Sequence, residues 1–320
     1  MDAAQRISRY GASVPTTLGG VVDNERALGW LMLAPALVYI IGFVGLPFVL
    51  AVLLAFGNAT VGNPGFHQFA GLSNFAEALR DPQFIVALRN SVVVTFATLL
   101  LLLVLATIES ELLARRFPGK RVVQILLILP WAMPVALSAI AWLWLLDAEF
   151  SPLDWIFRHI GILGPGGLFG PARHFYYLGY THLALASIVI INVWRMLPLA
   201  AIIVLAGRLS IPRELFEQAE IDGAGAFRIL FRITIPALMP VLVVAVLFTA
   251  LLVFGDMAIV DLLTRGGPAD STLVLPFWAY LKGINGGDLS GGAAVALFML
   301  PVLVAASVAA LRFAYRSQQT

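Results

Sequence analysis

Long apolar segments alternate with shorter polar ones along most of the chain. A transmembrane helix needs about 20 apolar residues to cross the ~30 Å hydrocarbon layer of a bilayer. Six stretches meet this requirement, at about 28–56, 89–114, 122–146, 181–207, 238–263 and 291–314. The pattern therefore predicts an all-α integral membrane protein with six transmembrane helices. We expect the polar residues 1–27 to precede a single membrane domain over residues 28–316.

The composition agrees with this pattern. Apolar residues make up 60% of the 320 positions and charged residues 12%, and the mean hydropathy is +0.93, which excludes a soluble globular protein. The first apolar run is too long for the core of a signal peptide, so we expect it to stay uncleaved. The absence of cysteine excludes disulfides and thiolate chemistry. The four histidines lack a ligand spacing such as H-E-x-x-H, so no metal site is expected.

The distribution of basic residues predicts an orientation. With an even number of spans, both termini lie on the same side of the membrane. The termini and the loops 115–121 and 208–232 hold thirteen Lys and Arg residues, whereas the loops on the opposite face hold six. The positive-inside rule therefore places both termini and the 208–232 loop in the cytoplasm. The net charge of +2 gives no indication of a nucleic-acid partner.

One loop is unusually charged for so apolar a chain. Residues 217–240 read EQAEIDGAGAFRILFRITIPALMP and connect the fourth and fifth spans. A short helix is predicted over 213–221, and Gly223 interrupts it because glycine tolerates backbone angles that a β-carbon forbids. A second short helix is predicted over 224–233, with Pro236 marking the return into the next span. Such a helix–turn–helix on a membrane face predicts a docking site for a partner protein.

This loop resembles the cytoplasmic coupling loop, or EAA loop, of ABC-importer permeases. The Asp before Gly-Ala resembles the carbohydrate-uptake (maltose-type) branch in particular, and Gln218 departs from the family pattern, which has a small residue there. The segment 69–91 also resembles these permeases, and the likeness covers residues ~30 to ~310. The residues that the resemblance implies contact the ATPase are Glu217, Ala219, Asp222, Gly223, Ala224, Phe231 and Pro236.

The resemblance implies the type I ABC-importer permease fold, with a cytoplasmic coupling helix in the loop 210–237. It also implies a bacterial plasma (inner) membrane complex with a second, related permease, two nucleotide-binding ATPase subunits and an extracytoplasmic solute-binding protein. ATP and Mg would bind the partner ATPase, since no G-x-x-x-x-G-K-[ST] motif follows a strand in this chain. We therefore expect a transport subunit that is not itself an enzyme and binds no cofactor of its own.

Polar residues inside the spans are candidates for the transport pathway. Arg195 lies about thirteen residues from the cytoplasmic end of the fourth span, hence ~20 Å deep, where a charge is costly. Asp256 in the fifth span is its predicted ion-pair partner, because a paired charge is cheaper to bury. Asn192 and Trp194 lie on the same span as Arg195. Trp142 either belongs to an interfacial aromatic belt or lines a sugar path. Arg195 either lines or gates the pathway or has a purely structural role.

Three local features give further predictions. Pro130 and Pro134 should bend or break the third helix, because proline removes a donor and clashes with the preceding turn. Glu111 and Arg115 are four residues apart at the end of the second span and can form an ion pair. The segment 75–88 is amphipathic and is predicted to lie along the membrane surface.

The sequence thus predicts the transmembrane subunit of an ATP-driven, binding-protein-dependent sugar importer. An alternative within the class is a permease for glycerol phosphate or another polyol, which the charge of Arg195 slightly favours. A different class is an ion-coupled secondary transporter, which would usually show repeat symmetry between its halves. A membrane-embedded transferase would need paired acids or a His/Asp cluster, for which the pair Glu109 and Glu111 is a thin basis.

Overall fold

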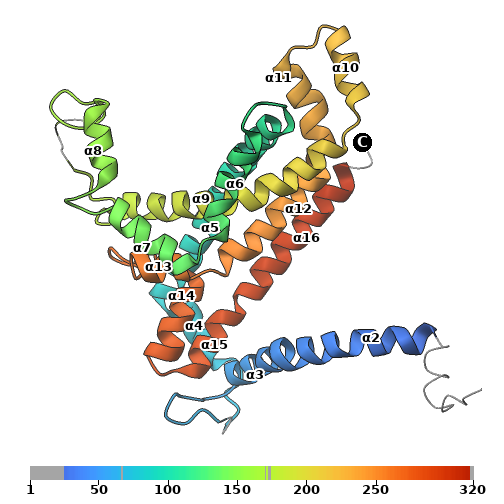
Figure 1. Cartoon of the computed structure of the whole chain (residues 1–320). Coiled ribbons are helices and arrows are strands. Elements are labelled where there is room, and N and C mark those ends of the chain that lie inside the picture. The colour runs from blue at the N-terminus through green and yellow to red at the C-terminus, as the bar shows by residue number, and fades with distance from the viewer. Residues whose placement is uncertain (1–24, 66–67, 170, 172–173, 318–320) are drawn as a thin grey trace, which may run out of the picture. The chain divides into compact units, whose positions relative to one another are not determined.

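The computed structural model describes residues 25–65, 68–169, 171 and 174–317. Most of the N-terminal segment predicted over 1–27 therefore lies outside the described residues. Over the described part the chain forms helices joined by loops, with no β-strand (Figure 1). The all-α membrane fold is confirmed for these residues. They fall into two compact units, one ending at Leu53 and the other beginning at Leu54.

The first unit is dominated by one long apolar helix. It is built from α2 (Glu25–Ile40), a π-helical turn (Ile41–Gly45) and α3 (Leu46–Ala55). The stretch Leu28–Ala55 is a candidate span, in agreement with the predicted first span.

The second unit contains the remaining elements, which Figure 1 labels. In chain order they are α4 (Ser73–Arg80), α5 (Pro82–Ala114), α6 (Lys120–Ala132), α7 (Val135–Leu145), α8 (Pro152–His159), α9 (Thr181–Ser210), α10 (Arg213–Ile221), α11 (Ala226–Ile229), a π-helical turn (Leu230–Thr234), α12 (Ile235–Phe254), α13 (Ala258–Leu263), α14 (Leu275–Tyr280), a second π-helical turn (Leu281–Asn285), α15 (Leu289–Leu297) and α16 (Met299–Ser317).

The core of this unit forms around α9. Helix α5 packs along α9, and α12 packs against α5, α9 and α16. The side chains of Ile188 and Ile191 on α9 are fully buried. Small residues allow close approach of membrane helices, and Gly207 is such a position, because an added β-carbon would lie 2.8 Å from a methyl carbon of Val241. Helix α9 therefore packs against several helices and lies at the centre of the bundle.

The third span is sharply bent. Helices α6 and α7 together are long and apolar enough to cross the membrane, but they meet at an angle of 99°. The break follows Ala132, and Met133 has extended backbone angles (φ −72°, ψ 139°), as expected for a residue before a proline. The predicted bend is therefore confirmed and belongs to Pro134, since Pro130 lies inside α6.

The second span begins earlier than its apolar run. The segment 75–88, predicted to lie along the membrane surface, is divided between two helices, because α4 ends at Arg80 and α5 begins at Pro82. The Asp81 carboxylate accepts a hydrogen bond from the backbone N–H of Gln83 at 2.9 Å. An N-cap acid followed by proline at the first helical position is a strong helix start. Residues after Asp81 thus belong to the transmembrane helix itself.

The fifth span also differs from the expected 238–263. Helix α11 continues through a π-helical turn into α12, so one apolar helix runs from Ala226 to Phe254. The separate short helix predicted over 224–233, with Pro236 as its boundary, is therefore wrong. A proline in a regular helix clashes with the carbonyl four residues earlier. The π-helical turn, in which the N–H of Ile235 bonds the carbonyl of Leu230, changes the local register and accommodates Pro236.

Candidate coupling surface and intramembrane polar centre

The loop between the fourth and fifth spans forms a helical hairpin. Helix α10 covers Arg213–Ile221 as predicted, and the chain reverses at Gly223, whose φ of +73° lies in the left-handed region that favours glycine. The N–H of Ala224 donates to the carbonyl of Ala219 at 2.9 Å, and Ala219 is buried. These contacts close the turn between α10 and α11. We call residues 213–234 the hairpin.

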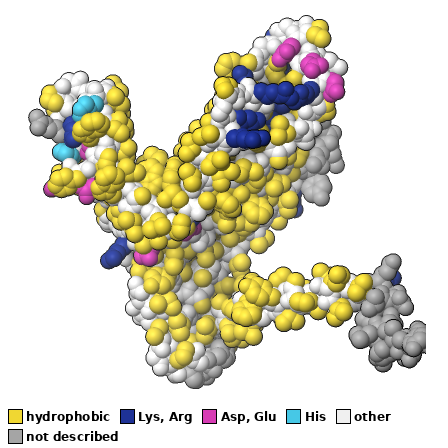
Figure 2. Space-filling model, viewed as in Figure 1, with side chains coloured by type: hydrophobic (Ala, Val, Ile, Leu, Met, Phe, Trp, Pro, Cys, Tyr) yellow, Lys and Arg dark blue, Asp and Glu magenta, His cyan; other side chains and the backbone are white. Residues whose placement is uncertain are grey.

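The outer surface of the hairpin combines exposed apolar and charged side chains. Of the seven residues predicted to contact the ATPase, Ala219 is buried and Ala224 half-buried, while the other five are exposed. Ile221 and Phe227 are 85% and 80% exposed, and Phe231 is 62% exposed. Basic and acidic side chains gather at this end of the molecule (Figure 2). Such a surface, with apolar anchors and a charged rim, has the composition of a protein-docking site.

A cleft lies between the hairpin and the ends of α5 and α9. It has a volume of about 750 Å³ and is lined by Glu111, Arg208, Phe216 and Thr234, among others. The predicted ion pair between Glu111 and Arg115 is wrong. Arg115 has left the helix (φ −75°, ψ 159°), and Glu111 instead accepts a hydrogen bond from Nε of Arg208 at 2.5 Å.

The predicted ion pair inside the membrane is present. Arg195 of α9 donates a hydrogen bond from Nη2 to Oδ2 of Asp256, and the two side chains are only 9% and 16% exposed. The sequence predicted Asp256 within the fifth helix. The structure places it in the break between α12 and α13. Its other oxygen, Oδ1, accepts the N–H of Ala258 at 2.7 Å. One carboxylate therefore neutralises the buried arginine and also accepts the N–H of the first residue of α13.

The remaining pathway candidates form two groups of contacts. Trp194 of α9 and Trp142 of α7 make an edge-to-face contact with ring centroids 5.5 Å apart. Asn192 is buried and donates to the carbonyl of Ile188 at 2.9 Å, while its Oδ1 atom has no hydrogen-bond partner among the described residues. Asn192 and Asp256 line the same small cavity. The structure thus brings Asn192, Arg195 and Asp256 together, and it pairs Trp142 with Trp194.

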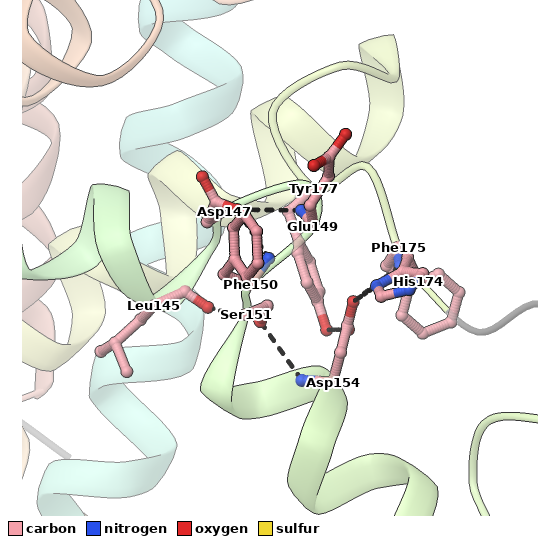
Figure 3. A network of polar contacts seen from close by, with 9 residues as sticks. All are labelled: Leu145, Asp147, Glu149, Phe150, Ser151, Asp154, His174, Phe175 and Tyr177. Carbon is pink, nitrogen blue, oxygen red and sulfur yellow. Dashed lines mark hydrogen bonds and ion pairs between the residues drawn. The ribbon is translucent and has the colours of Figure 1, made fainter.

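A polar network in the loop 147–180 is not evident from the sequence (Figure 3). The buried carboxylate of Asp154 accepts hydrogen bonds from the hydroxyl of Tyr177 at 2.6 Å and the N–H of Phe175 at 3.1 Å, and His174 Nδ1 lies 3.5 Å away. Burial and the neighbouring Asp154 raise the pKa of Tyr177 above its ordinary value. The Ser151 hydroxyl accepts the N–H of Asp154 at 3.2 Å. The Ser-Pro-Leu-Asp sequence, a capping pattern, is the signal that could have located α8.

The fold and these sites define a polytopic α-helical membrane protein with a charged helical hairpin between its fourth and fifth spans. Residues 103–317 match the family described as binding-protein-dependent transport system inner membrane component. The chain belongs to this family, and it is a transmembrane subunit of a binding-protein-dependent transport system. The resemblance noted in the sequence is thereby confirmed.

Its relatives are permeases of similar length. The chain is 27% identical to the sulfoquinovosyl glycerol permease SmoG of Agrobacterium fabrum, over 90% of this chain and 91% of the relative. It is 28% identical to the trehalose/maltose permease MalF of Thermococcus litoralis, over 90% and 94%. It is 30% identical to the sn-glycerol-3-phosphate permease UgpA of Salmonella typhi, over 91% and 95%.

A solved structure shows the same fold. A bacterial ABC transporter involved in the import of the acidic polysaccharide alginate superposes with a TM-score of 0.75 at 20% identity, covering 90% of this chain and 95% of that chain. The type I permease architecture expected from the sequence is therefore shared with a characterised importer.

Proposed function

We propose that this chain is one of two related permeases that together form the pathway of an ATP-driven sugar importer. In this complex an extracytoplasmic binding protein delivers the sugar, and two copies of a separate ATPase bind ATP and Mg²⁺. Both termini and the hairpin then lie in the cytoplasm, as the charge distribution indicates. Support comes from relatives named for trehalose and maltose, for sulfoquinovosyl glycerol and for diacetylchitobiose, and from a structural neighbour in complex with a saccharide-bound periplasmic protein.

The observation that carries the proposal is the surface of the hairpin. Ile221 and Phe227 are large apolar side chains at least 80% exposed at the tip of a charged segment. Exposed anchors of this kind mark interaction sites. The segment departs from the apolar pattern of the rest of the second unit, so it is unsuited to face lipid. An ATPase subunit is the partner that a transport subunit without its own nucleotide motif requires.

The hairpin has a direct mechanical connection to the ion pair of Arg195 and Asp256. The helix from Ala226 to Phe254 has 29 residues and is about 43 Å long at 1.5 Å per residue. Its outer end adjoins Asp256, which holds Arg195. A displacement of the hairpin by the ATPase therefore tilts a helix whose far end bears on the ion pair. This ion pair is the proposed gate. Trp142 and Trp194 provide aromatic faces on which a pyranose ring can stack.

Glycerol phosphate or another polyol is the alternative substrate. The relative UgpA is named for sn-glycerol-3-phosphate, and an unpaired arginine in the pathway would favour an anion. Arg195 is instead neutralised by Asp256, which removes the residue-level reason for preferring an anionic substrate. A sugar is the proposed cargo, with support from the relatives named for sugars.

The test is reconstitution of the chain with its candidate partner subunits. We expect the sugar-loaded binding protein to stimulate ATP hydrolysis and uptake. Replacing Ile221 and Phe227 by Asp should release the ATPase during purification. The matched control is Phe150→Asp, which charges a side chain that is 78% exposed at the start of the loop 147–180. Retention of the ATPase by the Ile221 and Phe227 variants, with uptake unchanged, would overturn the assignment of the hairpin.

A further inference from the structure

The two sides of the hairpin are attached to the bundle in different ways. On one side, α11 is continuous with the fifth span through the π-helical turn. On the other side, α10 is joined to α9 only by Ile211 and Pro212. None of the described elements packs extensively against α10, and Ala219 is its only buried residue. Helix α10 therefore depends on a small number of side-chain contacts to move with the bundle.

Arg208 makes side-chain contacts that attach α10 to the bundle. It lies in the last turn of α9 and its side chain is 18% exposed. Its guanidinium carbon lies 3.9 Å from the ring centroid of Phe216 on α10. Its Nε donates to Oε1 of Glu111 in the last turn of α5 at 2.5 Å. One planar cation thus links α9 to the neighbouring α10 and to α5, whose Glu111 lies 97 positions away in the sequence.

We propose that Arg208 is the positioning residue that makes α10 move together with the second and fourth spans. This inference rests on the proposed function, in which α10 receives the motion of the ATPase. The guanidinium is suited to the task because it is planar, stacks on an aromatic face and donates in a fixed direction. Without it, α10 can pivot about Ile211 and Pro212 while α5 stays in place. The fifth span would still move, since α11 is part of it.

We call the contacts of Arg208 with Phe216 and Glu111 the joint. The first test of the joint measures the distance between α10 and α5. The chain has no native cysteine, so spin labels can be placed through Gln218→Cys on α10 and Leu112→Cys on α5, both exposed positions. In the full chain in lipid nanodiscs, we expect a narrow distance distribution. Arg208→Gln should broaden it, and so should Phe216→Leu or Glu111→Gln. The control Arg116→Gln removes an exposed cation just beyond the end of α5 and should leave the distribution unchanged. Equal widths in the Arg208 variant and this control would overturn the proposal.

The second measurement is uptake per ATP hydrolysed in the reconstituted complex. Coupling between sites typically corresponds to a factor of about 5 to 150, so Arg208→Gln should lower this ratio about fivefold or more. The ATPase should still co-purify with the variant, because Ile221 and Phe227 are unchanged. An unchanged ratio would contradict the joint even if the ATPase binds. If no ATPase binds the wild-type chain while the label distances respond as expected, the proposed function fails and the joint stands.

Discussion

Neutralising Asp256 should destabilise the membrane domain by about 3 kcal/mol. The ion pair with Arg195 is largely buried, since its side chains are 9% and 16% exposed. Removing one partner of a buried pair costs about 3–5 kcal/mol, because the other charge remains without compensation. In Asp256→Asn the single amide oxygen can keep the hydrogen bond from Arg195 or the one from the N–H of Ala258, but not both. Because one of the two bonds is retained, the expected cost lies at the lower end of that range.

Two further variants separate the contributions of this carboxylate. Asp256→Ala removes the acceptors of both hydrogen bonds, and losing the second bond costs about 1 kcal/mol more. The double variant Arg195→Met with Asp256→Leu replaces both charges by apolar groups. Such replacements are often neutral or stabilising, so the double variant should be more stable than Asp256→Ala. The stability changes should therefore be strongly non-additive, as expected for residues in contact.

The assay is reversible unfolding in mixed detergent micelles, followed by the helical circular dichroism signal. Asp261→Asn is the matched control, because it makes the same change in α13 at a residue outside the pair. If Asp256→Asn unfolds at the same denaturant concentration as the wild type and the control, the pair does not stabilise the fold. The same result would also argue against the ion pair as the element that responds to movement of α12.

Three other perturbations give distinct outcomes. Gly223→Val should reduce uptake, because a side chain at a φ of +73° costs about 1–2 kcal/mol. Gly223→Asn should reduce uptake less, because asparagine tolerates this conformation. Equal uptake by the two variants would argue against a role of the turn. Asp154→Asn should open the outer loop, at a cost of about 1–3 kcal/mol, and accelerate tryptic cleavage there; an unchanged rate would contradict the network. The pKa of Tyr177 is raised in the folded protein, so the neutral side chain stabilises the loop. This stabilisation is fully present below the ordinary tyrosine pKa of about 10. It is lost as the pH rises through the higher pKa of the folded state. Ultraviolet titration should therefore show a late tyrosinate step that Tyr177→Phe abolishes, and its absence from the wild type would refute the assignment.

The sequence was sufficient to locate the membrane helices but not their ends. Hydrophobic runs identify spans because lipid selects apolar length, and all six predicted spans have helical counterparts among the described residues. Their ends depend on local backbone chemistry. Asp81-Pro82 was a readable helix start that the apolar run concealed. The π-helical turn that joins α11 to α12 has no composition signal of its own, so the hairpin's second arm was wrongly separated from the fifth span.

The same contrast holds for the sites. The pair of Arg195 and Asp256 could be predicted because a lone charge in lipid requires a partner and few acids lie at that depth. The partner of Glu111 could not, because the helix-spacing rule considers only local residues and Arg208 is 97 positions away. Asp154 was missed for a related reason. Its partners come together only when the loop 147–180 folds back on α8.

The π-helical turn at Leu230–Thr234 also has a consequence for how the family's docking surfaces can diversify. A π-helical turn holds one residue more than a regular one. Deleting a single residue there would restore regular geometry and rotate everything before it by about 100° about the helix axis. The direction in which the chain presents Phe227 is thus set by a single residue of this turn.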